Sequence, residues 1–130
     1  MEPKILVCIT PQSNGARLID SAAAIARARA GELHILHIEK GNNVFHTAES
    51  PMLLQRLFEY GAERGGVVHA FCGDNVPDVM TGFARTEKIG VMVFGEPPAV
   101  PDGKPTIVDT IHAALPQVEI VIVRREAQSP

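Results

Sequence analysis

The side chains with the widest chemical range in this sequence are five histidines: His34, His37, His46, His69 and His112. Structural and catalytic zinc sites take His and Cys ligands at short, regular spacings, and no HxH, HxxxH or CxxC spacing occurs here. His34 and His37 differ in strand parity, so we expect their side chains on opposite faces of one strand. We therefore expect no metal site. His37 is open to two interpretations, a ligand-binding residue or a hydrogen-bonded structural one.

The two cysteines, Cys8 and Cys72, fall in separate apolar runs that we expect to be the first and third strands. If the second strand lies between them, they are two strand spacings apart, about 9–10 Å. A disulfide needs closer Cα atoms, so we interpret both as small buried core residues. Two cysteines without a secretory segment favour a reducing compartment, the cytoplasm.

Acidic residues that could act in acid–base catalysis are scattered over several loops and a helix: Glu39, Asp74, Glu96, Asp102 and Asp109. No nucleophile of the GxSxG type accompanies them, and the basic residues near the predicted ligand end are Lys40 and Lys104. We expect a protein that is not an enzyme. Weak nucleotide hydrolysis remains an open alternative.

Five short apolar runs are predicted to be strands: Ile5–Ile9, Leu33–Ile38, Val67–Cys72, Gly90–Phe94 and Val118–Val123. The first, fourth and fifth are nearly continuous, which is typical of strands buried on both faces of a parallel sheet. Helix-period patterns lie between the runs. The helix signals are Leu18, Ala22, Ile25 and Ala26 before Gly31; Ser50-Pro51; Asp74 or Asn75 as a cap; and Pro105 before Ile107, Val108, Ile111 and Ala114. Phe71, Phe83 and Phe94 are expected in the core.

This alternation of strands and helices predicts a three-layer α/β/α domain with an open, doubly wound parallel sheet. We expect one domain over residues 1–126 and a flexible tail over 127–130. Ligands of such sheets bind beyond the carboxyl ends of the strands, where the winding direction reverses. Three segments are therefore candidates: Thr10–Asn14, His37–Lys40 and Gly95–Lys104.

The formal net charge of −3 argues against nucleic acid and anionic membranes as partners, since both select clustered Lys and Arg. The apolar run near the amino terminus is too short for a signal-peptide core, and no apolar run reaches membrane length. We expect no membrane association.

Several segments together resemble the universal stress protein family: Lys4–Ile9, Leu33–Ile38, Gly73-Asp74, Phe83-Ala84-Arg85 and Val91–Gly95. The stretch Ile107–Ile120 is similar to the stress-protein-type domain inside Kdp potassium-sensor histidine kinases. The resemblance implies five strands in the order 3-2-1-4-5, the adenine nucleotide alpha hydrolase-like fold. It also implies a homodimer formed through the last strand, a role in signalling and the stress response, and in many members an adenine-nucleotide site.

The chain departs from the ATP-binding pattern of that family at two places. Thr10-Pro11-Gln12 stands where ATP-binding members carry an Asp after the first strand. Their phosphate loop after the fourth strand reads G-x2-G-x9-G-[ST]; Gly95 fits its first glycine, but Pro98 occupies the second and Gly103-Lys104-Pro105-Thr106 arrives early. Proline has no N–H to donate and cannot adopt a positive φ, so we expect the usual phosphate-binding loop to be missing. Thr106, near a helix start, remains a candidate anion contact.

Three functional hypotheses follow. The first is a non-catalytic universal stress protein-like domain that signals by binding a ligand, by docking to a partner such as a histidine kinase, or by dimerising through Val118–Val123. The second is a sensor module for an adenine nucleotide: ATP, AMP or a cyclic dinucleotide. The third is a weak nucleotide hydrolase. The ligand-binding candidates are Thr10, Pro11, Gln12, Ser13, His37, Gly95, Glu96 and Thr106.

Overall fold

The computed structural model describes residues 3–9, 15–40, 49–96 and 103–124. Its strands form one parallel sheet in the order β3-β2-β1-β4-β5. The strands are β1 (Lys4–Cys8), β2 (Glu32–Lys40), β3 (Val67–Gly73), β4 (Val91–Gly95) and β5 (Glu119–Val123). The predicted fold class and strand order are confirmed.

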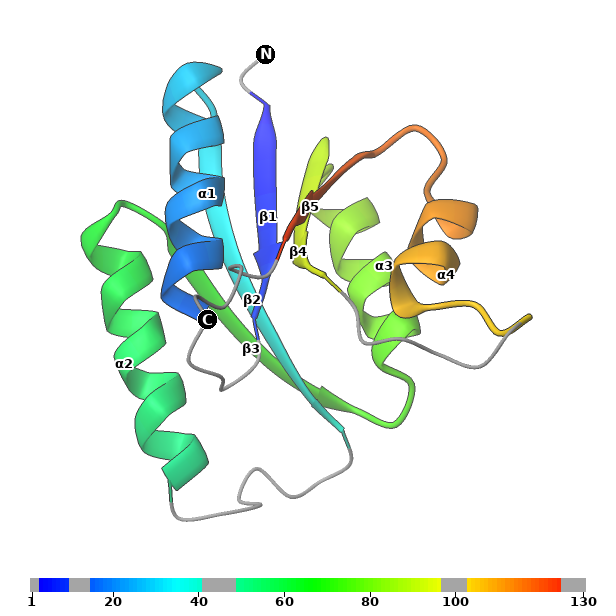
Figure 1. The fold of residues 1–130 in the computed structure, drawn as a ribbon, viewed down its shortest axis with the longest axis horizontal. Helices are drawn as coiled ribbons and strands as arrows, with labels where there is room; N and C mark the ends of the chain where they lie inside the picture. The colour runs from blue at the N-terminus through cyan, green and yellow to red at the C-terminus, as the bar shows by residue number, and fades with distance from the viewer. Residues whose placement is uncertain (1–2, 10–14, 41–48, 97–102, 125–130) are drawn as a thin grey trace, which may run out of the picture.

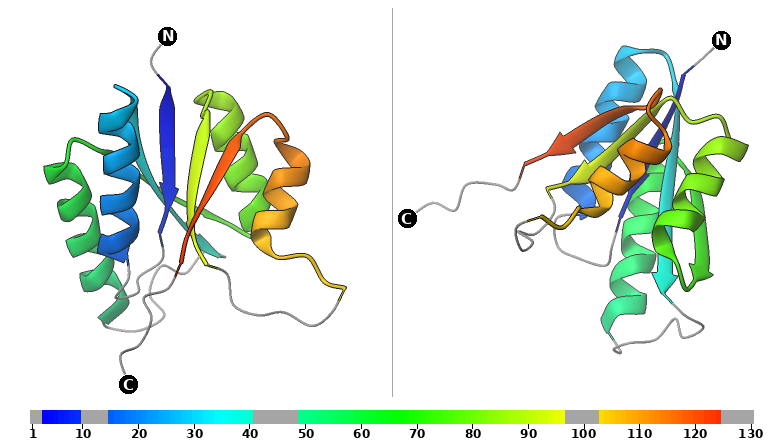
Figure 2. Two further views of the ribbon diagram at one scale, coloured as in Figure 1. Left: turned by 45° about the horizontal axis from the view of Figure 1, so that its top comes forward. Right: turned by 90° about the vertical axis from the view of Figure 1, so that its right-hand side faces the viewer.

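Four helices cover the two faces of this sheet: α1 (Gly15–Ala28), α2 (Glu49–Glu63), α3 (Val76–Thr86) and α4 (Ile107–Ala114). Helices α1 and α2 lie on one face, and α3 and α4 lie on the other (Figures 1 and 2). Within the described ranges, the starts of α3 and α4 carry side-chain caps. Asn75 accepts a hydrogen bond from the Asp78 N–H at the start of α3, and Thr106 with Asp109 forms a capping box at the start of α4.

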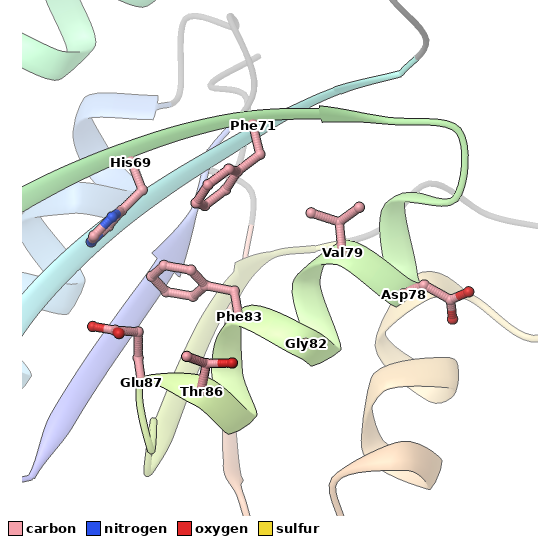
Figure 3. A pocket seen from close by; sticks show the side chains of 8 residues that line it. All are labelled: His69, Phe71, Asp78, Val79, Gly82, Phe83, Thr86 and Glu87. Atoms are coloured by element: carbon pink, nitrogen blue, oxygen red, sulfur yellow. The ribbon is translucent and has the colours of Figure 1, made fainter.

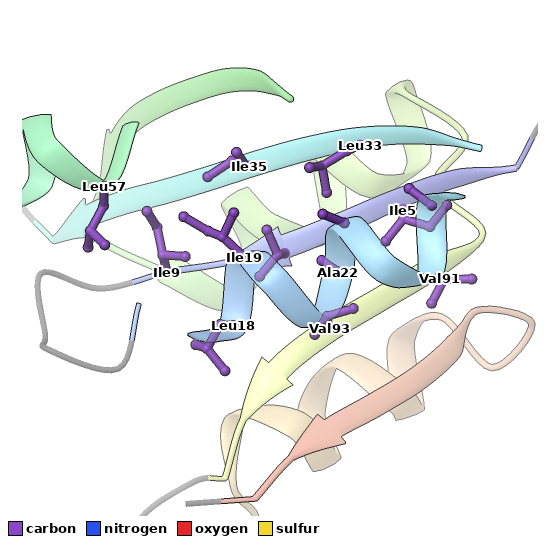
Figure 4. Close-up of a cluster of buried hydrophobic side chains, with 13 residues drawn as sticks. Ile5, Ile9, Leu18, Ile19, Ala22, Leu33, Ile35, Leu57, Val91 and Val93 are labelled. Carbon is purple, nitrogen blue, oxygen red and sulfur yellow. The ribbon is translucent and has the colours of Figure 1, made fainter. Parts of the chain in front are cut away.

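Each face of the sheet has its own hydrophobic core. Under α1 and α2, residues of alternate parity from β1, β2 and β4 pack against Leu18, Ile19, Ala22 and Leu57 (Figure 4). Under α3 and α4, the opposite parity of the same strands packs against Met80, Ala84, Ile111 and Leu115. Because β1 and β4 contribute to both cores, their residues 5–7 and 91–94 are buried, as their continuous apolar runs predicted.

Four positions differ from the sequence expectation, and the sheet edges explain three of them. β5 is an edge strand, so it is only partly buried, and Ile122 is 39% exposed. β3 is the other edge, which leaves Phe71 43% exposed and Cys72 exposed. The fourth is Ile107, predicted on the inner face of α4. It opens the helix and is 36% exposed, because the inward-facing positions come one residue and one turn later, at Val108 and Ile111.

The two cysteines lie on strands separated by β2, as expected, and both are free thiols. Cys8 is half-buried, and desolvation raises the pKa of its thiol to about 12. This thiol is therefore protonated at neutral pH and is a poor nucleophile. None of the helices in the described ranges combines the length and apolar character that a membrane crossing requires. The predicted tail, residues 127–130, lies outside those ranges.

Candidate functional site

The carboxyl ends of β1, β2 and β4 meet in the middle of the sheet. β1 pairs with β2 on one side and with β4 on the other, so the winding reverses between β1 and β4. Ile9 continues the β1 register, donating its N–H to the Leu36 carbonyl at 2.9 Å. Extending the two registers by one or two residues sets Ile9 between His37 and Gly95. The structure therefore brings together two of the predicted ligand-binding residues, His37 and Gly95.

The His37 side chain is buried in this region: it is 4% exposed, and only one of its two ring nitrogens has a hydrogen-bond partner. Its Nδ1 lies 3.0 Å from the Ile9 carbonyl oxygen. A carbonyl can only accept, so Nδ1 carries the proton and donates. In the neutral ring, Nε2 is then a lone-pair acceptor. Nε2 has no hydrogen-bond partner within the described part of the chain.

Among the described residues, Glu39 lies beside this unpartnered nitrogen. Its Oε2 lies 3.6 Å from His37 Nε2, and the Glu39 side chain is 12% exposed. That separation exceeds hydrogen-bonding distance, and a carboxylate cannot donate to a lone pair. A buried acceptor without a donor is costly. His37 Nε2 is therefore suited to accept a hydrogen bond from a ligand N–H or O–H.

Gly95 and Glu96 extend this region toward the β5 edge. Gly95 is the last residue of β4 and pairs with Val123, and the Glu96 N–H donates to the Val123 carbonyl at 3.1 Å. Glu96 is exposed. The backbone N–H of Glu96 is thus engaged in the sheet and is not available to a ligand.

Thr106 caps α4, and both its hydroxyl and its N–H are engaged there. Its hydroxyl accepts from the Asp109 N–H at 3.2 Å, and its N–H donates to the Asp109 carboxylate at 2.9 Å. The carboxylate therefore occupies the place where an anion would meet the start of the helix. A contact between Thr106 and a phosphate stays a prediction, and it requires Asp109 to move.

Four predicted ligand-binding residues, Thr10, Pro11, Gln12 and Ser13, lie outside the described residues, as does Pro98. Among the residues that are described, no three His, Cys, Asp or Glu side chains are grouped so that they could hold a metal ion. What the described part of the region offers is hydrogen bonding and shape: the buried Nε2 acceptor of His37 at the end of β2 and the small Gly95 at the end of β4, on either side of β1.

Solved structures of universal stress proteins share the fold of this chain. A universal stress protein in complex with cAMP matches with a TM-score of 0.69 and 15% identity, over 96% of this chain and 98% of that one. The Archaeoglobus fulgidus universal stress protein matches with a TM-score of 0.69 and 17% identity, over 94% and 93%. The chain has the universal stress protein fold. A further A. fulgidus structure, in complex with dAMP, matches with a TM-score of 0.62 and 16% identity, over 95% and 97%.

In sequence, the chain is similar to sensor protein KdpD of Mycobacterium tuberculosis in two strains, with 27% identity over 92 residues. This match covers 71% of the chain but only 10% of KdpD, so the chain spans about a tenth of the length of these curated relatives. No protein-family model matches the sequence. The resemblance to universal stress proteins and to the Kdp sensors, drawn from short segments, is thus confirmed.

Proposed function

We propose that this chain is a non-catalytic ligand-binding module with the universal stress protein fold, and that it binds an adenine nucleotide chiefly through the nucleoside part. The observation that carries the proposal is the position of β1, whose carboxyl end lies between those of β2 and β4, where the winding reverses. Ligands of open α/β sheets bind at that point. Two structural neighbours of the same fold are complexes with cAMP and with dAMP.

The chemistry of His37 supports nucleoside recognition. An adenine amino group or a ribose hydroxyl is a donor, and it would satisfy the buried Nε2 lone pair. A phosphate oxygen is an acceptor at neutral pH, and it would leave the lone pair of the neutral ring unsatisfied. The polarity of this atom therefore favours the sugar or the base at the end of β2.

The phosphate side of the site is where we propose that this module differs from ATP-binding members. Pro98 removes one glycine from the loop pattern, and the Asp109 carboxylate already accepts from the N–H of Thr106, the residue that caps α4. A second negative charge at that helix start would be repelled. We accordingly propose that the second and third phosphates of ATP add little affinity.

Adenine nucleotides are expected to stabilise the protein against heat. At one hundred times its dissociation constant, a ligand adds about 2.7 kcal/mol, which for a chain of this size raises Tm by roughly 8–15 °C. The measurement is thermal unfolding with AMP, cAMP, cyclic di-AMP and ATP, with GMP and cGMP as matched controls. Equal shifts with guanine and adenine nucleotides, or no shift with any of them, would contradict the proposal.

The module is further proposed to act in signalling, beside or as part of a sensor kinase, and to dimerise through β5. Similarity to KdpD supports the first part. The second is supported by the exposed edge of β5. The Glu119 N–H donates to Gly90, and the Val123 carbonyl accepts from Glu96, so residues 119 and 123 direct their peptide groups toward β4. Ile120 and Ile122 then direct theirs to the open edge, where a second strand can pair.

Ile122→Pro is expected to convert a dimer into a monomer. Proline removes the outward N–H of residue 122 but no hydrogen bond to β4, so the fold is retained. Light scattering coupled to size exclusion at high micromolar concentration measures the mass, and Ile122→Val, which keeps both the N–H and the apolar surface, is the control. A monomeric wild type, or a dimeric Ile122→Pro variant, would refute pairing through this edge.

A further inference from the structure

A groove of about 460 Å³ runs between the edge strand β3 and helix α3. This volume lies within the range of small-molecule sites. Figure 3 shows His69 and Phe71 on the strand and Phe83 on the helix pointing toward one another across it. The groove lies on the α3 and α4 face, whereas His37, one position out of phase with Leu36, lies on the α1 and α2 face. It is therefore a separate surface from the candidate nucleotide site.

The walls of the groove are aromatic. The Phe83 ring meets the His69 ring edge-on at 4.6 Å between centroids and lies tilted at 5.8 Å from Phe71. Phe71 is 43% exposed, although apolar rings of this size are usually buried. A flat apolar ligand that covered Phe71 would complete the cluster, because aromatic rings stack and pack edge-to-face at these separations.

Two hydrogen bonds, between Glu32 and His34 and between His34 and His69, form a relay that determines which nitrogen of His69 carries the proton. Buried His34, which is 3% exposed, has Nε2 at 2.7 Å from the Glu32 carboxylate and Nδ1 at 2.9 Å from His69 Nε2. A carboxylate only accepts, so the His34 Nε2–H donates to it, and in the neutral ring Nδ1 accepts from the His69 Nε2–H. The remaining nitrogen, His69 Nδ1, is then a lone-pair acceptor. It has no hydrogen-bond partner among the described residues.

The charge of the groove is negative. The ionisable side chains that line it are His69, Asp78 and Glu87, and no Lys or Arg of the described residues lines it. An anionic ligand would meet two carboxylates, whereas a cation would be attracted by them and by the faces of the phenylalanine rings.

We propose that the groove between β3 and α3 binds a small organic cation with a flat apolar body, of the class of protonated aromatic amines, and that Glu32 and His34 hold His69 as the acceptor of its N–H. The inference rests on the relay, the aromatic walls and the carboxylates, and it does not depend on the proposed nucleotide site.

The relay also makes this binding sensitive to pH. A proton added to His69 occupies the lone pair of Nδ1 and turns that atom from an acceptor into a donor. Glu32 on β2 is hydrogen-bonded to His34, Glu87 after α3 acts electrostatically on His69, and Asp78 on α3 lines the same groove. Burial and the neighbouring His34 lower the pKa of His69, while Glu87 opposes this shift. We therefore expect the cation to bind more weakly as the pH falls.

The test is a titration of backbone amide NMR signals with tryptamine at about pH 8, where an unperturbed His is neutral. Tryptophol is the neutral control, and indole-3-propionate is the anionic one. We expect tryptamine to shift the signals of Phe71 and of residues 79–87, but not those of His37 or Gly95. The anion should bind more weakly than the cation. Shifts elsewhere, no shifts, or equal binding of the anion would overturn the proposal.

Two variants separate the roles of charge and relay. Glu87→Gln should weaken tryptamine binding roughly two- to fivefold, as expected for a partly exposed charge pair, while Glu59→Gln on α2 should leave it unchanged. His69→Phe keeps an aromatic ring at this position but removes the acceptor, so binding should fall and lose its dependence on pH between about pH 8 and about pH 5.5. An unchanged pH dependence in His69→Phe would show that the relay does not act on this groove.

Discussion

Ile35→Ala is expected to lower the free energy of unfolding by about 2–5 kcal/mol, a large fraction of the roughly 5–15 kcal/mol of a typical domain. Ile35 is fully buried in the middle of β2, and the core under α1 and α2 packs around it. Its Cδ1 fills the space left by two glycines, because an added Cβ would collide with it at Gly61 and would lie 2.7 Å from it at Gly66. Urea unfolding followed by circular dichroism measures the loss.

The control for this prediction is Met52→Ala. Met52 lies on α2, is 58% exposed, and should change stability by no more than about 0.5 kcal/mol. Gly61→Ala offers a sharper comparison. In the wild type its methyl group collides with Ile35, but in Ile35→Ala it enters the cavity and adds helix propensity, so the double variant should recover part of the loss. If the two substitutions were additive, or Ile35→Ala cost nothing, the packing described here would be wrong.

His37→Ala is expected to abolish most of the response to AMP, weakening binding at least about tenfold. The substitution removes the buried Nε2 acceptor that we propose for the nucleoside. It also leaves the Ile9 carbonyl without its donor, so the free energy of unfolding should fall by about 1–3 kcal/mol. Isothermal titration calorimetry of AMP, at a temperature where the variant is folded, measures the affinity.

The matched control for His37 is His112→Ala. His112 is an exposed histidine on α4, so its loss should alter neither AMP affinity nor stability. His37→Gln adds a second arm, since its amide can donate to the Ile9 carbonyl and restore stability without restoring the imidazole lone pair. A His37→Ala variant that binds AMP as the wild type does would remove His37 from the proposed site.

The strands, the helices and their order along the chain could be predicted, because β1 and β4 are buried on both faces and each helix carries one apolar stripe. The burial of side chains on the edge strands β3 and β5 could not be predicted in this way. The apolar run of β5 reads like that of β4, yet β5 has a neighbour on one side only, and Ile122 is exposed. Whether a continuous apolar run lies in the centre or at an edge depends on strand order, which here came from the family resemblance.

The candidate site was predictable in outline and incomplete in detail. The rule that ligands bind beyond the carboxyl ends of the strands selects both His37 and Gly95. Only the three-dimensional structure reveals that His37 Nε2 is buried without a hydrogen-bond partner. The contact between His34 and His69 does not show in any local sequence pattern, because it joins residues 35 positions apart. A usable signal was present: both are histidines of the same face on strands that are neighbours in the order 3-2-1-4-5. The capping box at Thr106 also has a signal in the sequence, because Asp109 follows this threonine three residues later.

The central claim is that the carboxyl ends of β1, β2 and β4 bind the nucleoside part of an adenine nucleotide. Its most direct test is to map backbone amide NMR shifts during titration with AMP and, separately, with ATP. We predict that both nucleotides shift the signals of Cys8, Ile9, His37, Glu39 and Gly95, with dissociation constants that agree within about threefold. AMP shifts confined to other surfaces, or ATP binding more than about tenfold tighter than AMP, would contradict it.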